Sequence, residues 1–96
     1  MNGKKLYQVN YVSFDESDSY LWTEFGTPTT DKKKAKADFK QTCKNTRSTI
    51  RDEKKEGNVE WYNETKSENM CEFEVMDNGS VQQIRIELVE FTIKED

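Results

Sequence analysis

The fold is decided by residues 30–56, TDKKKAKADFKQTCKNTRSTIRDEKKE, which carry the only long helical pattern in the chain. At about 100° per residue, small and apolar side chains fall on one side of this helix. They are Ala35, Phe39, Thr42, Cys43, Thr46 and Ile50. Thr29 or Thr30 is expected to cap the N-terminus of the helix, and Gly57 is expected to end it. A stripe this weak predicts a helix that is stabilised by packing against a sheet.

Charge is unevenly distributed around this helix and along the chain. One flank of the apolar stripe is basic and the other is acidic. Residues 31–56 contain ten Lys or Arg and five Asp or Glu, a net charge of +5, whereas the other residues contain five against fourteen, a net charge of −9. The whole chain has a net charge of −4. Because contacts with phosphate are made by clustered Lys and Arg, this acidity argues against a general nucleic-acid-binding or membrane-binding protein.

Alternating apolar and polar residues predict strands on both sides of the helix. The expected strands are residues 5–14, 20–26, 71–75 and the segment after Ser80, while residues 59–65 form either a further strand or a loop. The first two strands are expected to form a hairpin, and Asp77-Asn78-Gly79-Ser80 predicts a type I′ turn between the last two. The sequence therefore predicts an α+β fold, with one domain over residues 1–96. An antiparallel sheet of four to five strands carries one long helix on one face, in the order ββαββ(β).

The apolar residues of the last strand change phase near its middle. Ile84, Ile86 and Leu88 alternate in one phase. Val89, Phe91 and Ile93 alternate in the opposite phase. A β-bulge at Leu88-Val89 would keep all six on one face. Alternatively, the strand crosses from one buried surface to another.

The residues needed for common catalytic sites are missing from the sequence. It contains no histidine, which removes the commonest general base and the usual activator of Ser and Cys nucleophiles. Its four glycines stand alone and form no phosphate-binding loop. Glu72 and Glu74 form a carboxylate pair, but on the open face of a strand both are solvated, with no burial to distinguish one as an acid and the other as a base. We expect a protein that is not an enzyme and that uses no cofactor or metal.

The two cysteines and the lack of apolar segments indicate the compartment. No segment has the length and hydrophobicity of a membrane span or signal peptide, so the sequence predicts a cytoplasmic protein. Cys43 lies on the helix stripe, and Cys71 occupies an apolar position in a later strand. In a reducing compartment both are expected to be free and buried, and a disulfide or a shared metal is the alternative.

Carboxylates are expected to gather on the sheet face opposite the helix and in the first turn. The predicted partner-binding surface consists of Glu60, Tyr62, Glu64, Glu72, Glu74, Glu87 and Glu90, together with Asp15, Glu16 and Asp18. Such a surface suits a partner protein with a basic surface. A narrower hypothesis makes the chain a phage or mobile-element inhibitor that imitates nucleic acid and occupies a host nucleic-acid-handling or defence enzyme.

Two other functions compete with the acidic surface. The basic flank of the helix could follow a phosphate backbone through Lys36, Lys40, Lys44, Arg47 and Arg51. Alternatively, the chain is a homo-oligomeric structural or regulatory subunit, in which the long final strand offers a free edge to a second copy.

Overall fold

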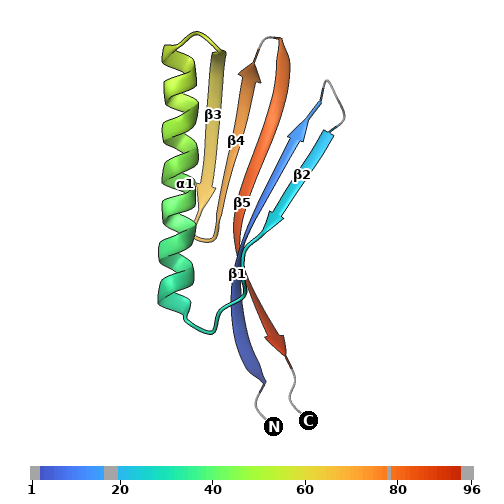
Figure 1. Cartoon of the computed structure of the whole chain (residues 1–96), viewed down its shortest axis with the longest axis vertical. Coiled ribbons are helices and arrows are strands. Elements are labelled where there is room, and N and C mark those ends of the chain that lie inside the picture. Colours follow the sequence, from blue (N-terminus) through green and yellow to red (C-terminus); the bar gives the residue numbers. More distant parts are fainter. Residues whose placement is uncertain (1–2, 17–19, 78, 94–96) are drawn as a thin grey trace.

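The protein is a single antiparallel sheet with one long helix on one of its faces. A computed structural model describes residues 3–16, 20–77 and 79–93. Its elements are β1 (Lys4–Asp15), β2 (Tyr20–Phe25), α1 (Lys32–Lys55), β3 (Val59–Ser67), β4 (Met70–Asp77) and β5 (Ser80–Ile93). The strand order is β2-β1-β5-β4-β3, and all neighbours are antiparallel (Figure 1). This confirms the α+β class and the five-stranded form of the prediction.

The first and last strands pair with each other along the whole of β1. β1 and β5 match from Lys4 opposite Ile93 to Asp15 opposite Gln82, so the start of β1 and the end of β5 lie at the same end of the sheet (Figure 1). β5 is paired with β1 on one side and with β4 on the other. The prediction that the final strand offers a free edge is therefore wrong, because the edges of the sheet are β2 and β3.

The register of β5 also decides between the two predictions for its change of phase. Its pairing with β1 is continuous, so the predicted bulge at Leu88-Val89 is wrong. Ile84 and Ile86 point towards α1 and are buried, while Val89, Phe91 and Ile93 lie on the opposite face. The described irregularity lies instead in β3, where the pairing with β4 shifts between Val59 and Trp61. We call the face that carries α1 the helix side and the other the open face.

The helix begins one residue later than its threonine candidates suggest. Asp31 is the N-cap, and its side chain accepts a hydrogen bond of 3.0 Å from the backbone N–H of Lys34. Thr29 supports this cap by accepting a 3.1 Å hydrogen bond from the N–H of Asp31. A carboxylate also interacts favourably with the positive end of the helix dipole. At the other end, Gly57 adopts a φ of 85°, as predicted for the residue that ends the helix.

The hydrophobic core lies between α1 and the helix side of the sheet. Its buried members are Phe39, Cys43, Ile50, Val59, Cys71, Phe73, Val75, Ile84 and Ile86. Phe73 on β4 and Ile86 on β5 are completely inaccessible to solvent. The hairpin that places these two strands together is confirmed: Asp77 pairs with Ser80, and Gly79 has a φ of 81°. Asn78, and with it the predicted turn type, lies outside the described residues.

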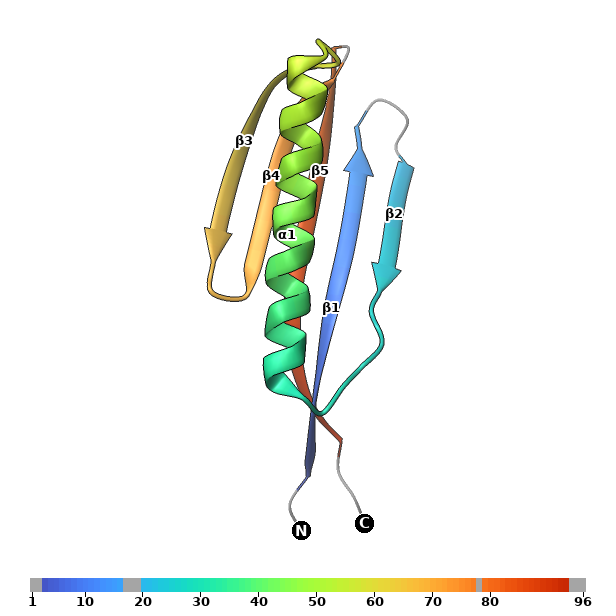
Figure 2. The same ribbon diagram turned by 60° about the vertical axis from the view of Figure 1, so that its left-hand side comes forward.

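The helix leaves part of the helix side uncovered. In both views β2 stands clear of α1, on the far side of β1 (Figure 1, Figure 2). Within the described residues, no helix combines the length and the hydrophobicity needed to cross a membrane.

Candidate functional site

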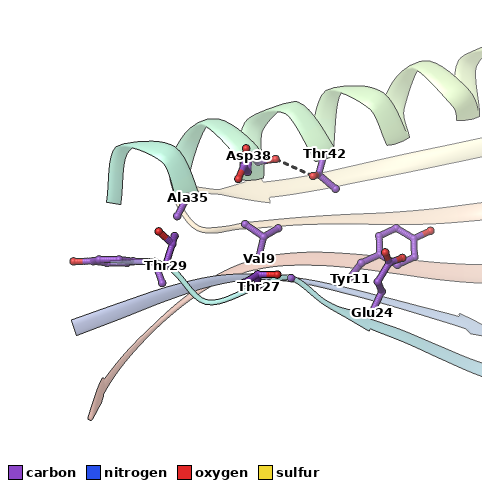
Figure 3. A pocket seen from close by; sticks show the side chains of 10 residues that line it. Val9, Tyr11, Glu24, Thr27, Thr29, Ala35, Asp38 and Thr42 are labelled. Atoms are coloured by element: carbon purple, nitrogen blue, oxygen red, sulfur yellow. Dashed lines mark hydrogen bonds between the residues drawn. The ribbon is translucent and has the colours of Figure 1, made fainter. Parts of the chain in front are cut away.

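A groove runs between α1 and the helix side of the sheet. It consists of two hollows: one of about 260 Å³ lies between the N-terminal half of α1 and β1, and one of about 360 Å³ lies between the C-terminal half of α1 and strands β3, β4 and β5. Tyr11 lines both hollows and joins them. Figure 3 shows the first hollow, with Asp38 and Thr42 projecting from α1 towards Val9 and Tyr11 of β1. We call the two hollows together the helix–sheet groove.

The floor of the groove is held in place by the segment that leads from β2 to α1. Gly26 donates its N–H to the carbonyl of Val9 at 2.8 Å, and Gln8 donates its side-chain amide to the carbonyl of Gly26 at 2.7 Å. A Cβ atom at Gly26 would lie 2.7 Å from the Val9 carbonyl oxygen, so this approach requires glycine. Tyr7 and Thr29 exchange two backbone hydrogen bonds of 2.8 and 2.9 Å. The segment is thereby fixed against β1 before the helix begins.

Carboxylates from three elements line the groove. Glu24 of β2 and Asp38 of α1 line the first hollow, and Glu53 of α1 and Asp77 of β4 line the second. Among the described residues, no Lys or Arg lines either hollow. The flank of α1 that borders the groove is therefore the acidic one. A groove with this lining attracts cations and repels phosphate.

Two polar groups in the groove are available to a ligand. Burial raises the pKa of the Tyr11 hydroxyl, and the nearby charge of Glu24 raises it further. The Tyr11 hydroxyl is protonated at neutral pH, as in any tyrosine, and can donate a hydrogen bond to a ligand. The Oδ1 atom of Asp77 is buried and accepts no hydrogen bond from the described residues. A buried acceptor without a donor is unfavourable, so a donor that enters the second hollow would be stabilised there.

On the other flank of α1, an ion pair fastens the helix to β3. Arg47 donates its Nε to Glu64 Oε1 at 2.7 Å and its Nη2 to Glu64 Oε2, and both side chains are largely buried. Arg51 donates to the hydroxyl of Tyr62 at 3.2 Å. The hydrogen bonds from Arg47 lower the pKa of the Glu64 carboxyl in spite of its burial. This ion pair holds α1 against β3, in addition to the apolar contacts of the core beneath the helix.

The two thiols lie beside this pair and are not activated. Both cysteines are free and buried. The Cys71 thiol donates to Glu64 Oε2 at 3.3 Å. Burial, followed by the neighbouring Cys43 and Glu64, raises the pKa of Cys71 to about 12, and burial raises the pKa of Cys43. Both thiols therefore stay protonated at neutral pH, unlike the thiolate of a nucleophilic cysteine. No cluster of described residues has the composition of a metal site.

The raised thiol pKa predicts a loss of stability in alkali. The folded pKa of Cys71 lies above its ordinary value of 9.0, so its contribution is complete below about pH 9. It is lost as the pH rises towards 12, because only the unfolded thiol ionises freely in that range. Urea unfolding at pH 8, 9 and 10 should show a steeper decline for the natural chain than for Cys71→Ala. Equal pH slopes for the two proteins would contradict this assignment.

The predicted acidic surface is divided between the two faces of the sheet. Glu72, Glu74 and Glu87 lie on the open face, as expected from their alternation. Tyr62, Glu64 and Glu90 lie instead on the helix side, which corrects their predicted placement. The position of Tyr62 and Glu64 follows from their contacts with α1, and Glu90 pairs in register with the buried Tyr7 and lies 3.3 Å from Lys5 Nζ. For Tyr62 and Glu64 the cause is the register shift after Val59, which reverses the alternation in β3. For Glu90 the cause is the continuous register of β5, which has no bulge at Leu88-Val89.

The remaining members of that surface are scattered. Glu60 is exposed at the irregularity of β3. Asp15 accepts a 2.8 Å hydrogen bond from the Ser80 hydroxyl, and the backbone N–H of Glu16 donates to the Val81 carbonyl. Asp18 lies outside the described residues. On the open face, Arg85 binds Glu72 at 2.9 Å and Glu87 at 3.3 Å. The open face therefore carries less unbalanced negative charge than the sequence suggests.

The basic flank of α1 is also partly engaged within the fold. Arg47 and Arg51 contact β3, as described above, and Lys36 is half-buried. Lys40 and Lys44 are exposed. Two of the five cations predicted to follow a phosphate backbone are thus committed to holding the helix, which weakens the nucleic-acid hypothesis.

Sequence reasoning missed Glu24, Asp38, Glu53 and Asp77 as members of one site. The acidic flank of the helix was visible in the sequence, but the strands that face it depend on the long-range pairing of β1 with β5.

Comparison with family models, with curated proteins and with solved structures finds no match for the chain.

Proposed function

We propose that the chain is a small, non-enzymatic interaction protein that binds a basic segment of a partner protein in the helix–sheet groove. The observation that carries this proposal is the lining of the groove, in which each of the two adjoining hollows has two carboxylates and, among the described residues, no Lys or Arg. These carboxylates are Glu24, Asp38, Glu53 and Asp77. The proposed partner is a protein with a basic surface, as inferred from the sequence, but the proposed binding site is the groove instead of the open face.

The other groups of the groove suit Lys and Arg side chains. Tyr11 offers an aromatic ring against which an aliphatic stem or a cationic head can pack. The buried ring of Tyr7 already makes a contact of this kind within the chain, because the Nζ atom of Lys32 lies 5.9 Å from its centre. Thr29 and Thr42 add hydroxyl groups to the same hollow. An extended basic segment could therefore place cationic heads at the carboxylates and its backbone near the threonines.

The narrower hypothesis is that the partner is a host nucleic-acid-handling or defence enzyme and the chain a phage or mobile-element inhibitor. Imitation of duplex DNA requires dense negative charge, about one charge per 1.7 Å of helix axis. Arg85 interrupts the carboxylates of the open face. The groove supports the more general proposal of a basic protein partner, and inhibition of such an enzyme would be a special case of it.

A matched pair of variants tests the proposal. Fluorescence anisotropy would follow a labelled 12-residue peptide rich in Lys and Arg at about 150 mM salt. We expect Glu24→Gln/Asp38→Asn to weaken binding about tenfold, since each partly exposed ion pair contributes up to about 1 kcal/mol. Glu72→Gln/Glu74→Gln removes the same charge from the open face and should change the affinity less than twofold. Equal losses in the two variants, or a larger loss in the second, would reject the groove.

A further inference from the structure

Most of the exposed large apolar side chains lie on the open face of the sheet. Of the six large apolar side chains that are exposed in the described chain, Trp22 alone lies on the helix side. The other five, on the open face, are Phe14, Leu21, Phe25, Trp61 and Ile93. Leu6, Val12, Val81, Val89 and Phe91 are half-buried on the same face. The residues on a sheet face that contacts only water are normally polar. A contiguous apolar patch on such a face marks an interaction site.

We propose that a second copy of the chain covers this face, so that two sheets pack face to face in a symmetric dimer. The available area fits this occupant. Five strands at about 4.8 Å spacing give a width of about 24 Å, and the extended β1–β5 ribbon lengthens the surface beyond the other strands (Figure 1). The resulting area is on the order of 800 Å², which is the area that each partner contributes to a stable interface.

The charges of the open face are only partly paired within the chain. Arg85 contacts both Glu72 and Glu87, which leaves one unbalanced negative charge in this cluster, and Glu74 is exposed on the neighbouring strand position of β4. A second copy is therefore expected to keep these carboxylates at the hydrated rim of the interface. Its centre would be the apolar side chains of β1 and β2, whose complement in shape and chemistry is the same surface of another copy. A two-fold axis brings identical patches together in this way.

One polar atom on this face lacks a partner in the described chain. The Oδ1 atom of Asn10 is buried and accepts no hydrogen bond. It lines a hollow of about 350 Å³ whose apolar wall includes Val12, Phe14 and Phe25 and whose polar wall is formed by Gln83, Arg85, Glu72 and Glu87. A donor from the facing copy could reach Asn10, and an apolar side chain could fill the remaining space. The helix–sheet groove lies on the other side of the sheet, so it stays accessible in this dimer.

Sedimentation velocity between about 5 and 200 μM tests the dimer. The natural chain should sediment at twice the monomer mass of 11.3 kDa at the upper concentrations. Leu21→Glu/Phe25→Glu should raise the dimer dissociation constant at least 100-fold, because both side chains, 59% and 65% exposed in the single chain, would carry charge into the interface. Trp22→Glu is the matched control: Trp22 is 50% exposed on the same strand but faces the helix side, so this variant should remain dimeric.

Circular dichroism would establish that each variant is folded. Should the glutamate pair misfold, Leu21→Ser/Phe25→Ser provides a milder version, for which at least a tenfold weakening is expected. A natural chain that stays monomeric at 200 μM would overturn the proposal. Dimerisation that survives the open-face substitutions, or that is lost in Trp22→Glu, would also overturn it. Peptide binding in the groove is measured separately and is expected to persist in the monomeric variant.

Discussion

Phe73→Ala is expected to lower the free energy of unfolding by about 3–5 kcal/mol, the usual cost of removing a phenyl ring from a packed core. Phe73 is completely inaccessible to solvent at the centre of β4 and belongs to the core cluster beneath α1. Small domains have a total stability of about 5–15 kcal/mol, so this single change would remove much of it. Urea unfolding followed by circular dichroism would measure the difference.

A surface aromatic residue provides the control for this experiment. Trp22→Ala removes a larger ring, but Trp22 is 50% exposed, so the expected loss is below about 1 kcal/mol. All proteins should be compared at one concentration, because association would add to the apparent stability. Similar losses for Phe73→Ala and Trp22→Ala would mean that the core does not lie between β4 and α1.

Arg47→Met is expected to destabilise the fold by about 2–4 kcal/mol. The substitution keeps much of the aliphatic stem but leaves the carboxylate of Glu64 without its cation at a site that is only 17% exposed. A charge buried without a partner is strongly unfavourable. Adding Glu64→Gln to Arg47→Met should recover part of the loss, since it removes the unpaired charge. A double-mutant cycle with urea unfolding would give the coupling energy.

Arg85→Met is the matched control for this pair. Arg85 also binds a carboxylate, that of Glu72 at 2.9 Å, but its side chain is 54% exposed. The expected loss is therefore below about 1 kcal/mol.

The lowered pKa of Glu64 adds a dependence of stability on pH. The carboxylate contributes fully to stability above the ordinary pKa of 4.5, and this contribution is lost as the pH falls below that value. The role of the Arg47–Glu64 ion pair would be contradicted if it stabilised the fold no more than Arg85 and Glu72 do. It would also be contradicted if Glu64→Gln left the loss of stability in acid unchanged.

Local patterns in the sequence predict the elements well. The helix, the two hairpins and the half-buried alternation of Cys71, Phe73 and Val75 all follow from periodicity and turn chemistry. The N-cap differs by one position, since Asp31 offers both a hydrogen-bond acceptor and a favourable charge. These features depend on residues close together in the chain, which is why the sequence alone is sufficient for them.

Pairing between distant strands is what the sequence does not reveal. Because β1 and β5 are adjacent, the final strand lies inside the sheet, and no local pattern in the sequence predicts this pairing. The register shift between Val59 and Trp61 then turns Tyr62 and Glu64 to the helix side. A one-residue change of register exchanges the two faces of a strand, so the predicted acidic surface could not be placed correctly from alternation alone.

The two faces of the sheet are therefore proposed to have different roles. The helix side contains the core, the ion pair of Arg47 and Glu64 and, along the acidic flank of α1, the carboxylate-lined groove. The open face carries exposed apolar side chains and the ion pairs of Arg85 with Glu72 and Glu87. Basic partners are proposed to bind the groove on the helix side, and a second copy is proposed to cover the open face. One dimer would then present two grooves.

The most direct test of the proposed function is a nitrogen-15 NMR titration of the natural chain with the same basic peptide. The largest shift changes are predicted for the amides of Tyr11, Glu24 and Asp38, which surround the first hollow. They should disappear in Glu24→Gln/Asp38→Asn. Changes concentrated at Glu72 and Glu74 on the open face, or no changes at millimolar peptide, would contradict binding in the helix–sheet groove.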